Sequence, residues 1–71
     1  MIVEITFESG DGSEQASYRY EVRDFAEHRA AVDSGQHDGI IRQVTPAIRN
    51  EIGLDARYLS TTVDGVVQPA R

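Results

Sequence analysis

Residues 40–52, with the sequence IIRQVTPAIRNEI, decide which of two folds the chain adopts. Their apolar side chains recur at spacings of three, four and four, which is the pattern of one buried helix face. That face consists of Ile41, Val44, Ile48 and Ile52. Pro46 opposes a continuous helix, because proline in a helix interior removes a hydrogen bond and costs ~3 kcal/mol. The alternative is a short strand over residues 40–44, an N-cap at Thr45 and a two-turn helix from Pro46, since a residue before proline avoids the helical region. We favour one helix that ends at Gly53, because the apolar stripe is unbroken.

Two alternating segments flank a glycine-rich turn nearer the start of the chain. Residues 2–8 place apolar side chains at every second position, and residues 15–23 do the same. This is the period of a half-buried strand. Residues 9–13, Ser-Gly-Asp-Gly-Ser, contain two glycines that are free to take positive φ. The segment therefore predicts an antiparallel β-hairpin.

A short helix is predicted over residues 25–34, between the hairpin and the ambiguous segment. Asp24 precedes it as an N-cap, and Glu27 follows three positions later, as in a capping box. Gly35 supplies the left-handed position at which many helices end. Residues 36–39 are polar, and we expect them to form a connection rather than part of a helix.

The last part of the chain predicts one strand and a short second one. Residues 58–63 are rich in β-branched side chains, as strands are. Asp-Gly at 64–65 is a two-residue hairpin signal. Residues 66–67 then form a brief final strand.

The expected fold is a single α+β domain over residues 1–71. Its order is strand, strand, helix, helix, strand, with a short final strand. We expect a small antiparallel or mixed sheet, built from the N-terminal hairpin and one or two C-terminal strands, with two helices packed on one face. With a strand over residues 40–44, the element order resembles instead the ubiquitin-like β-grasp. Even so, we do not expect the chain to be conjugated to other proteins, because the sequence ends without the diglycine tail of ubiquitin-type modifiers.

Composition excludes several classes of function. The 71 residues carry twelve acidic and seven basic side chains, a net charge of −5, and every basic residue is arginine. The chain has no cysteine, so it can hold neither a disulfide nor a cysteine-based zinc site. No apolar stretch approaches the roughly 20 residues that a membrane span needs. The acidity argues against direct nucleic-acid binding, which depends on a basic surface. We therefore expect a cytoplasmic protein that contacts neither membrane nor nucleic acid.

The two histidines are the first candidates for catalysis or metal binding. No cysteine and no evident Ser-His-Asp group accompanies them, and a separation of nine residues matches no usual zinc spacing. We expect His28 to pair with Asp24 across one helix turn. We expect His37 to be solvated in a polar connection beside Asp38, which is placed to cap the next helix. The sequence thus predicts no catalytic residue, no metal and no cofactor.

Acidic residues concentrate in the first half of the chain. Residues 1–38 hold nine acids and three arginines, a net charge of −6, whereas residues 39–71 hold three acids and four arginines, a net charge of +1. Five of the acids belong to the predicted hairpin or its turn: Glu4, Glu8, Asp11, Glu14 and Glu21. Arg19 and Arg23 are placed to pair with the first two across the strands. The simplest interpretation is a solvated face that keeps a small protein soluble. The functional interpretation is an interface that attracts a basic partner.

The functional hypothesis is a non-catalytic module that binds a larger protein with a basic surface, through those five acids. In size and composition the chain resembles phage-encoded inhibitors of bacterial defence nucleases, the anti-CRISPR group among them. That resemblance implies an inhibitor that occupies the basic surface of such a nuclease. The alternative is a small structural or assembly subunit that forms homo-oligomers, a homodimer among them, through an exposed strand edge.

Overall fold

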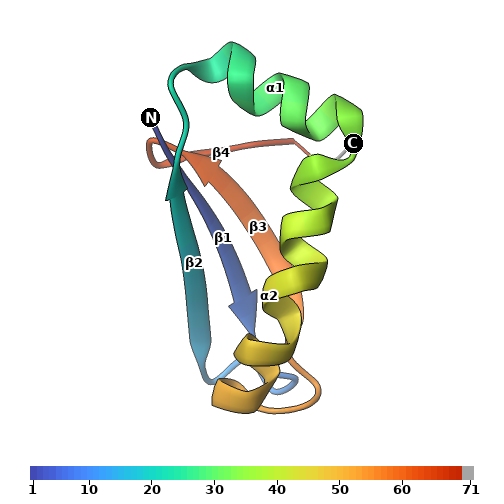
Figure 1. The fold of residues 1–71 in the computed structure, drawn as a ribbon. Helices are drawn as coiled ribbons and strands as arrows, with labels where there is room; N and C mark the ends of the chain where they lie inside the picture. The colour runs from blue at the N-terminus through green and yellow to red at the C-terminus, as the bar shows by residue number, and fades with distance from the viewer. Residues whose placement is uncertain (70–71) are drawn as a thin grey trace.

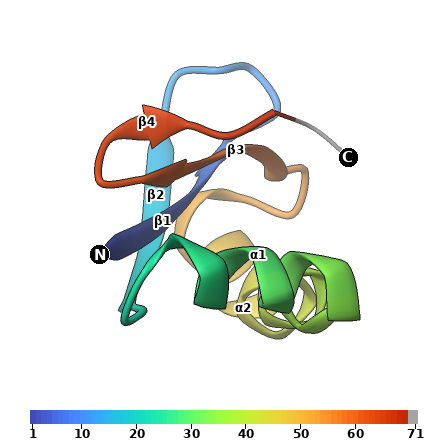
Figure 2. The same cartoon turned by 90° about the horizontal axis from the view of Figure 1, so that it is seen from above.

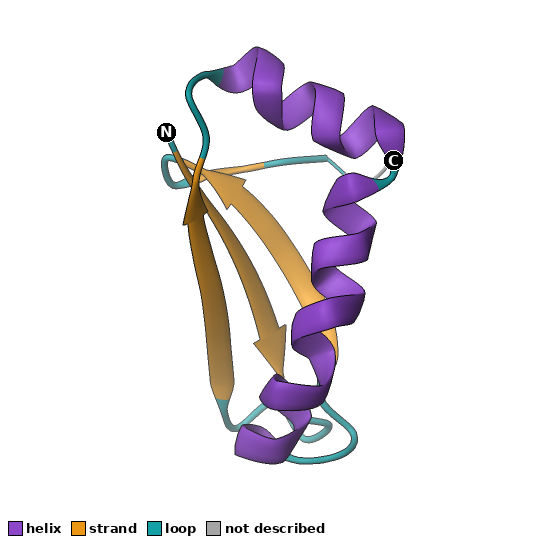
Figure 3. Ribbon diagram, viewed as in Figure 1, coloured by secondary structure: helices purple, strands orange, loops and turns teal. Residues whose placement is uncertain are grey.

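The sheet contains four antiparallel strands in the order β2-β1-β3-β4, and two helices cover one of its faces (Figures 1 and 3). The structure, a computed structural model, describes residues 1–69. Its elements are β1 (Ile2–Glu8), β2 (Gln15–Glu21), α1 (Phe25–Ser34), α2 (Gln36–Ile52), β3 (Arg57–Val63) and β4 (Val66–Val67). The view from above separates the sheet from the two helices on its one side (Figure 2). The predicted α+β class, with its two helices on one face, is confirmed.

The hairpin of β1 and β2 forms in the register that the alternation of apolar residues requires. Ile2 lies opposite Glu21, and Phe7 lies opposite Ala16. Residues directly opposite each other share a face of the sheet, so the alternating apolar residues from Val3 and from Ala16 onward turn toward the helices, whereas Ile2 lies on the open face. The core lies between this face and α2. Its buried hydrophobic residues are Val3, Ile5, Phe7, Val22, Val32, Ile48, Ala56 and Val63.

Residues 40–52 are helical throughout, so the strand over residues 40–44 and the β-grasp order that depended on it are wrong. Pro46 lies inside α2, where its side chain is exposed. There the carbonyl that loses its helical donor can turn to water. Directly before Pro46, the Thr45 hydroxyl donates to the carbonyl of Ile41, one turn back, at 2.6 Å. The gain from burying Ile48 and its neighbours therefore outweighs the single lost hydrogen bond.

Helix α2 also begins earlier than predicted. Residues 36–39 form its first turn instead of a connection, and Asp38 lies within that turn instead of capping it. Gly35, with φ of 83°, joins the two helices directly and acts as C-cap of α1 and N-cap of α2. The N-terminus of α1 follows the prediction, because the Asp24 carboxylate accepts a hydrogen bond from the Glu27 N–H at 2.9 Å.

The last two strands are joined by the predicted two-residue turn. Asp64 and Gly65 both have positive φ, 48° and 82°, as in a type I′ hairpin. The Asp64 carboxylate also accepts a hydrogen bond from the Ile2 N–H at 2.7 Å, which fixes the turn against the start of β1. Within residues 1–69, no helix has the length and apolar character to cross a bilayer.

Candidate functional site

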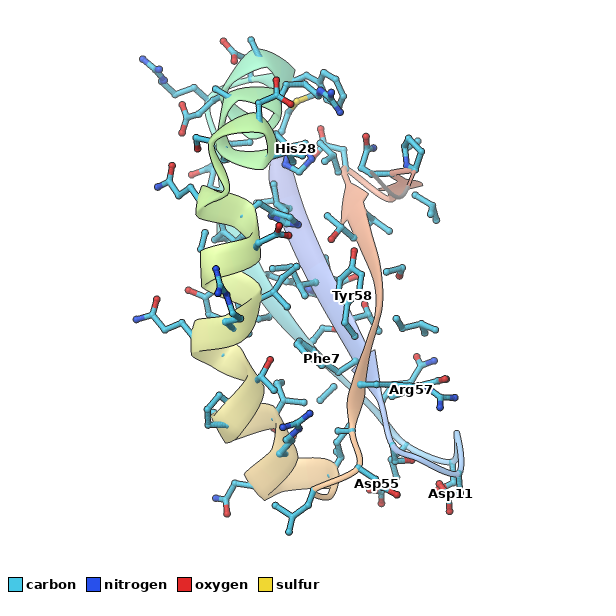
Figure 4. All side chains as sticks on the ribbon, turned by 90° about the vertical axis from the view of Figure 1, so that its right-hand side faces the viewer. Phe7, Asp11, His28, Asp55, Arg57 and Tyr58 are labelled. Atoms are coloured by element: carbon cyan, nitrogen blue, oxygen red, sulfur yellow. The ribbon has the colours of Figure 1, made fainter. Side chains whose placement is uncertain are left out.

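Two connections meet at the end of the sheet where β1 leads into the hairpin turn. Residues 9–14 join β1 to β2, and residues 53–56 join α2 to β3. Figure 4 shows Asp11 and Asp55 at this same end. The two connections are in contact, since a Cβ added at Gly10 would overlap the Asp55 carboxylate. Asp11 and Asp55, which are 44 positions apart in the sequence, thus lie at the same end of the sheet.

Asp11 organises the hairpin turn and is held in its charged form. Its Oδ1 atom accepts three hydrogen bonds, from Ser9 Oγ at 2.8 Å, the Ser13 N–H at 3.0 Å and Ser13 Oγ at 2.7 Å. The bonds from Ser13 and then Ser9 lower the pKa of Asp11 from 3.8 to about 2. Ser9 also accepts a hydrogen bond from the Glu14 N–H at 3.1 Å, through its hydroxyl. The turn therefore presents a carboxylate that is charged at neutral pH, on a backbone that these hydrogen bonds hold in place.

The connection between α2 and β3 is fixed by hydrogen bonds to the end of the helix. The Gly53 N–H donates to the Arg49 carbonyl at 2.9 Å, and the Ala56 N–H donates to the Gly53 carbonyl at 3.1 Å. Arg49 Nε adds a hydrogen bond to the Ala56 carbonyl at 3.3 Å. Leu54 projects from this connection with 86% of its surface exposed, more than any other exposed large hydrophobic residue among those described. We call Asp11, Glu14, Leu54 and Asp55 the acidic end.

Two of the five candidate acids form ion pairs with arginines on the open face of the sheet, which the helices do not cover. Glu4 pairs with Arg19 across β1 and β2, as predicted. Glu8 pairs with Arg57 of β3, whose Nη2 lies 3.0 Å from Oε1. The prediction that Arg23 would serve as a cross-strand partner is wrong, because Arg23 pairs with Glu27, four residues along the chain.

The other three candidate acids form no ion pair with any of residues 1–69. Asp11 and Glu14 belong to the acidic end, whereas Glu21 lies at the opposite end of β2. The structure thus divides the five candidates into two that are paired, two at the acidic end and one remote from it. Asp55 and Leu54 join the acidic end although the sequence did not single them out, because only the fold brings their connection to the hairpin turn.

The two histidines lie together in the interior, which overturns both predictions made for them. His28 is 1% exposed and His37 is 6% exposed, with ring centroids 5.3 Å apart in an edge-to-face arrangement. His28 does not pair with Asp24, whose carboxylate caps the helix instead. His37 is not solvated in a connection, because residues 36–39 are the first turn of α2. Figure 4 shows His28 between its helix and the sheet.

His37 joins a chain of hydrogen-bonded side chains that crosses the sheet. Its Nδ1 lies 3.0 Å from the Tyr20 hydroxyl of β2, and its Nε2 lies 3.0 Å from Thr61 Oγ1 of β3. Thr61 Oγ1 lies 2.7 Å from the Tyr58 hydroxyl. A neutral imidazole donates from one ring nitrogen and accepts at the other, so the hydroxyls of Tyr20 and Thr61 satisfy both ring nitrogens of His37. We call these four residues together with His28 the histidine cluster.

Burial keeps both imidazoles neutral. Desolvation is the main cause that lowers the pKa of His28 and of His37 below the 6.5 of a free imidazole. The positive charge of Arg29 adds to the effect at His28, and His28 adds to it at His37. The Nδ1 atom of His28 has no hydrogen-bond partner among residues 1–69.

The histidine cluster borders a cleft of about 330 Å³ between the helices and β3. A hydroxyl beside a neutral imidazole has the chemistry of a nucleophile and its general base. Thr61, however, is buried, and its oxygen lies within hydrogen-bond distance of both His37 and Tyr58. Its contact with His37 connects α2 to the sheet. Within the described chain, no three His, Asp or Glu side chains group as metal ligands would.

The sequence did contain a signal for the burial of both histidines. His28 stands four positions before Val32, which is buried in the same helix. His37 stands four positions before Ile41 and so extends the apolar stripe of α2 by one turn. A stripe continued through histidine would have predicted two buried rings.

Comparison of the chain with protein-family models, with curated proteins and with solved structures finds no match.

Proposed function

We propose that this domain is a non-catalytic protein-binding module whose acidic end docks on the basic surface of a larger, cytoplasmic protein. The observation that carries the proposal is that three unpaired carboxylates and an exposed leucine lie on two adjoining connections at one end of the sheet. Asp11, Glu14 and Asp55 have no arginine partner within residues 1–69, and Leu54, which directly precedes Asp55 in the sequence, is 86% exposed.

The grouping has the features of a protein interface. Unpaired carboxylates attract a basic surface from a distance and suppress approach to acidic ones. An exposed apolar side chain among them supplies area that is buried only when a partner covers it. The hydrogen bonds around Asp11 hold the turn before binding, so little flexibility is lost on docking.

The sharpest form of the proposal is a phage-encoded inhibitor of a bacterial defence nuclease, of the anti-CRISPR type. A nuclease that holds nucleic acid presents a basic groove, and an acidic domain can occupy it in place of the phosphate backbone. In that case the inhibitor competes with nucleic acid and needs no chemistry of its own. The net charge of −5 and its excess in the first half of the chain support this form.

Affinity capture with matched charge reversals tests the proposal. The full chain is immobilised, exposed to a bacterial lysate, and the retained proteins are identified by mass spectrometry. The test variant is Asp11→Arg with Glu14→Arg. The control is Glu21→Arg with Asp33→Arg, which changes the net charge by the same amount, from −5 to −1, away from the acidic end.

We expect proteins that are retained by the wild type and the control but released by the test variant. Their retention should fall as salt is raised, because exposed charges are screened. Equal retention by the wild type and the test variant would contradict the proposal. Loss in the control alone would move the interface to the other acids. Thermal unfolding of each variant checks that it is folded.

A further inference from the structure

Strand β2 is a long, regular edge of the sheet. It pairs only with β1 among the described strands, and its seven residues pair without a bulge. It contains no proline. The opposite edge is β4, which is only two residues long. A long regular edge strand offers unpaired backbone groups to another strand, which most proteins prevent by proline, bulges, short edges or charged side chains, and of these β2 has only the charges of Arg19 and Glu21.

The hydrogen-bond pattern of the hairpin shows which backbone groups of β2 are free. Met1 and Val22 exchange both backbone bonds, each at 2.9 Å, and the Ser9 N–H donates to the Glu14 carbonyl at 2.9 Å. Bonded and non-bonded pairs alternate along an antiparallel ladder. The even-numbered residues of β2 therefore bond to β1, and the odd-numbered residues direct their N–H and C=O groups to the free edge. These are Gln15, Ser17, Arg19 and Glu21.

We propose that two copies of this chain pair antiparallel through β2, with Tyr18 of one copy opposite Tyr18 of the second. In this register Ser17 faces Arg19 of the second copy, and Gln15 faces Glu21 of the second copy. All four outward residues of each strand then meet outward residues, so every free backbone group of the edge gains a partner. The two sheets become one sheet of eight strands with a two-fold axis at Tyr18.

Charge, ladder length and backbone phase together select this register over its neighbours. Centred on Tyr18, the pairing places each charged side chain of β2 opposite a neutral one. A shift of two residues in one direction places Arg19 opposite Arg19 of the second copy, which is repulsive. A shift in the other direction places Glu21 beyond the end of the second strand and shortens the ladder. Shifts by one residue set outward backbone groups against groups that already bond to β1.

Tyr18 is incompletely covered in the single chain, and the second copy covers it. Its side chain is 41% exposed, although its cross-strand neighbour Ile5 is fully buried. Its ring lies 6.0 Å from that of Tyr20, at the margin of the face that the helices cover. In the proposed pairing the two Tyr18 side chains form a non-bonded pair, the type in which side chains approach most closely. Aromatic pairs are favourable in that position.

A second copy suits this edge better than an unrelated strand, because the edge is complementary to itself in length, charge and backbone phase. The pairing also leaves the acidic ends free, since two-fold symmetry places them at opposite ends of the joined β2 strands. The dimer is therefore independent of the proposed partner binding, and one can fail while the other stands.

Cysteine scanning tests the register directly, because the natural chain has no cysteine. Ser17→Cys, Tyr18→Cys and Arg19→Cys are each oxidised mildly, and the covalent dimer is measured on a non-reducing gel. We expect Tyr18→Cys to form disulfide-linked dimer fastest, since only at this position do the two Cβ atoms face each other within bonding range. Fastest linkage at 17 or 19 would overturn the register. Equal, slow linkage at all three would overturn the edge pairing.

Sedimentation equilibrium of the wild-type chain gives the second readout. We expect a mass of twice 7.9 kDa at high micromolar concentration. Ser17→Pro should restore the single mass, because the Ser17 N–H points to the free edge and proline removes it without breaking a bond to β1. Circular dichroism checks that this variant is folded, and the cysteine series decides the question if it is not. A wild type that remains at 7.9 kDa would overturn the proposal.

Discussion

The histidine cluster and the acidic end are both built around polar side chains, but His28 and His37 are buried whereas Asp11 is exposed. In both places the pKa of a key group is lowered. For His28 and His37 burial is the main cause, and the lower pKa keeps the rings neutral. For Asp11 hydrogen bonds are the cause, and the lower pKa keeps the carboxylate charged in water. The first region packs the helices against the sheet, and the second is exposed to solvent.

The largest effect should come from breaking the histidine cluster. His37→Ala removes the partner of the Tyr20 hydroxyl and one of the two partners of Thr61, and it opens a cavity between α2 and the sheet. We expect a loss of about 2–4 kcal/mol in the free energy of unfolding. Urea denaturation measures it. Asp38→Ala, an exposed neighbour in the same helix turn, is the control and should cost less than about 1 kcal/mol. Equal losses would show that the cluster has no special role.

Lowering the pH should reduce the stability that the histidine cluster contributes before it protonates Asp11. The folded-state pKa of both histidines is below 6.5, so below that pH the unfolded chain binds more protons. Their contribution to stability is complete above about pH 6.5. It falls on acidification by up to about 1.4 kcal/mol per pH unit for each histidine. Denaturation at pH 7, 6 and 5 measures the slope.

Asp11 provides the contrast to that pH dependence. Its contribution is present above its ordinary pKa of 3.8 and is lost as pH falls toward 2. Removing Asp11 with Asp11→Asn should therefore leave the slope between pH 7 and 5 unchanged. A flat stability profile over that range in the wild type would contradict the buried, neutral state of the histidines.

Two glycine substitutions, one at the acidic end and one in α2, should change the stability of the fold in opposite directions. Gly10→Ala forces the Asp55 carboxylate to move, because the added Cβ occupies its place, and should cost about 1 kcal/mol. Gly39→Ala lies in helix with open space around the added carbon, and should stabilise by about 0.5–1 kcal/mol. Thermal unfolding gives both signs. A Gly10→Ala protein as stable as Gly39→Ala would show that the two connections do not touch.

The smallest effect is expected on the open face of the sheet. Glu4→Gln removes the ion pair with Arg19, which is largely exposed on the arginine side. Exposed pairs contribute about 0–1 kcal/mol, so we expect a loss within that range that shrinks further in high salt. Chemical denaturation at low and high salt measures it. A loss comparable to that of His37→Ala would show that the open face contributes as much to stability as the histidine cluster.

Local patterns were enough to predict most of the fold. Alternation gave the hairpin, Asp24 gave the start of α1, and Asp64-Gly65 gave the last turn. Residues 40–52 were resolved correctly because the apolar stripe outweighs one proline on the exposed side of the helix. The first turn of α2 was missed, since its polar residues resemble a connection and Gly35 ends one helix while it begins the next.

The candidate site was less accessible to sequence reasoning. Pairing within the hairpin, such as Glu4 with Arg19, follows from register. The partner of Glu8 comes from β3, 49 residues away, and Asp55 reaches Gly10 only through the fold. The apolar stripes of α1 and α2 could have predicted that both histidines are buried, but the contact between their rings depends on how the two helices pack. Contacts between distant segments are what a local pattern does not contain.

The most direct measurement is an interface map on the isotope-labelled full chain with a protein that the affinity capture retains. Amide chemical shifts are compared before and after that protein is added. We predict changes confined to residues 9–14 and 53–56, which carry Asp11, Glu14, Leu54 and Asp55, with loss of these changes in the Asp11→Arg, Glu14→Arg variant. Changes centred instead on β2 or on α1, or a lysate from which the chain retains nothing, would contradict the assignment of the acidic end as the binding surface.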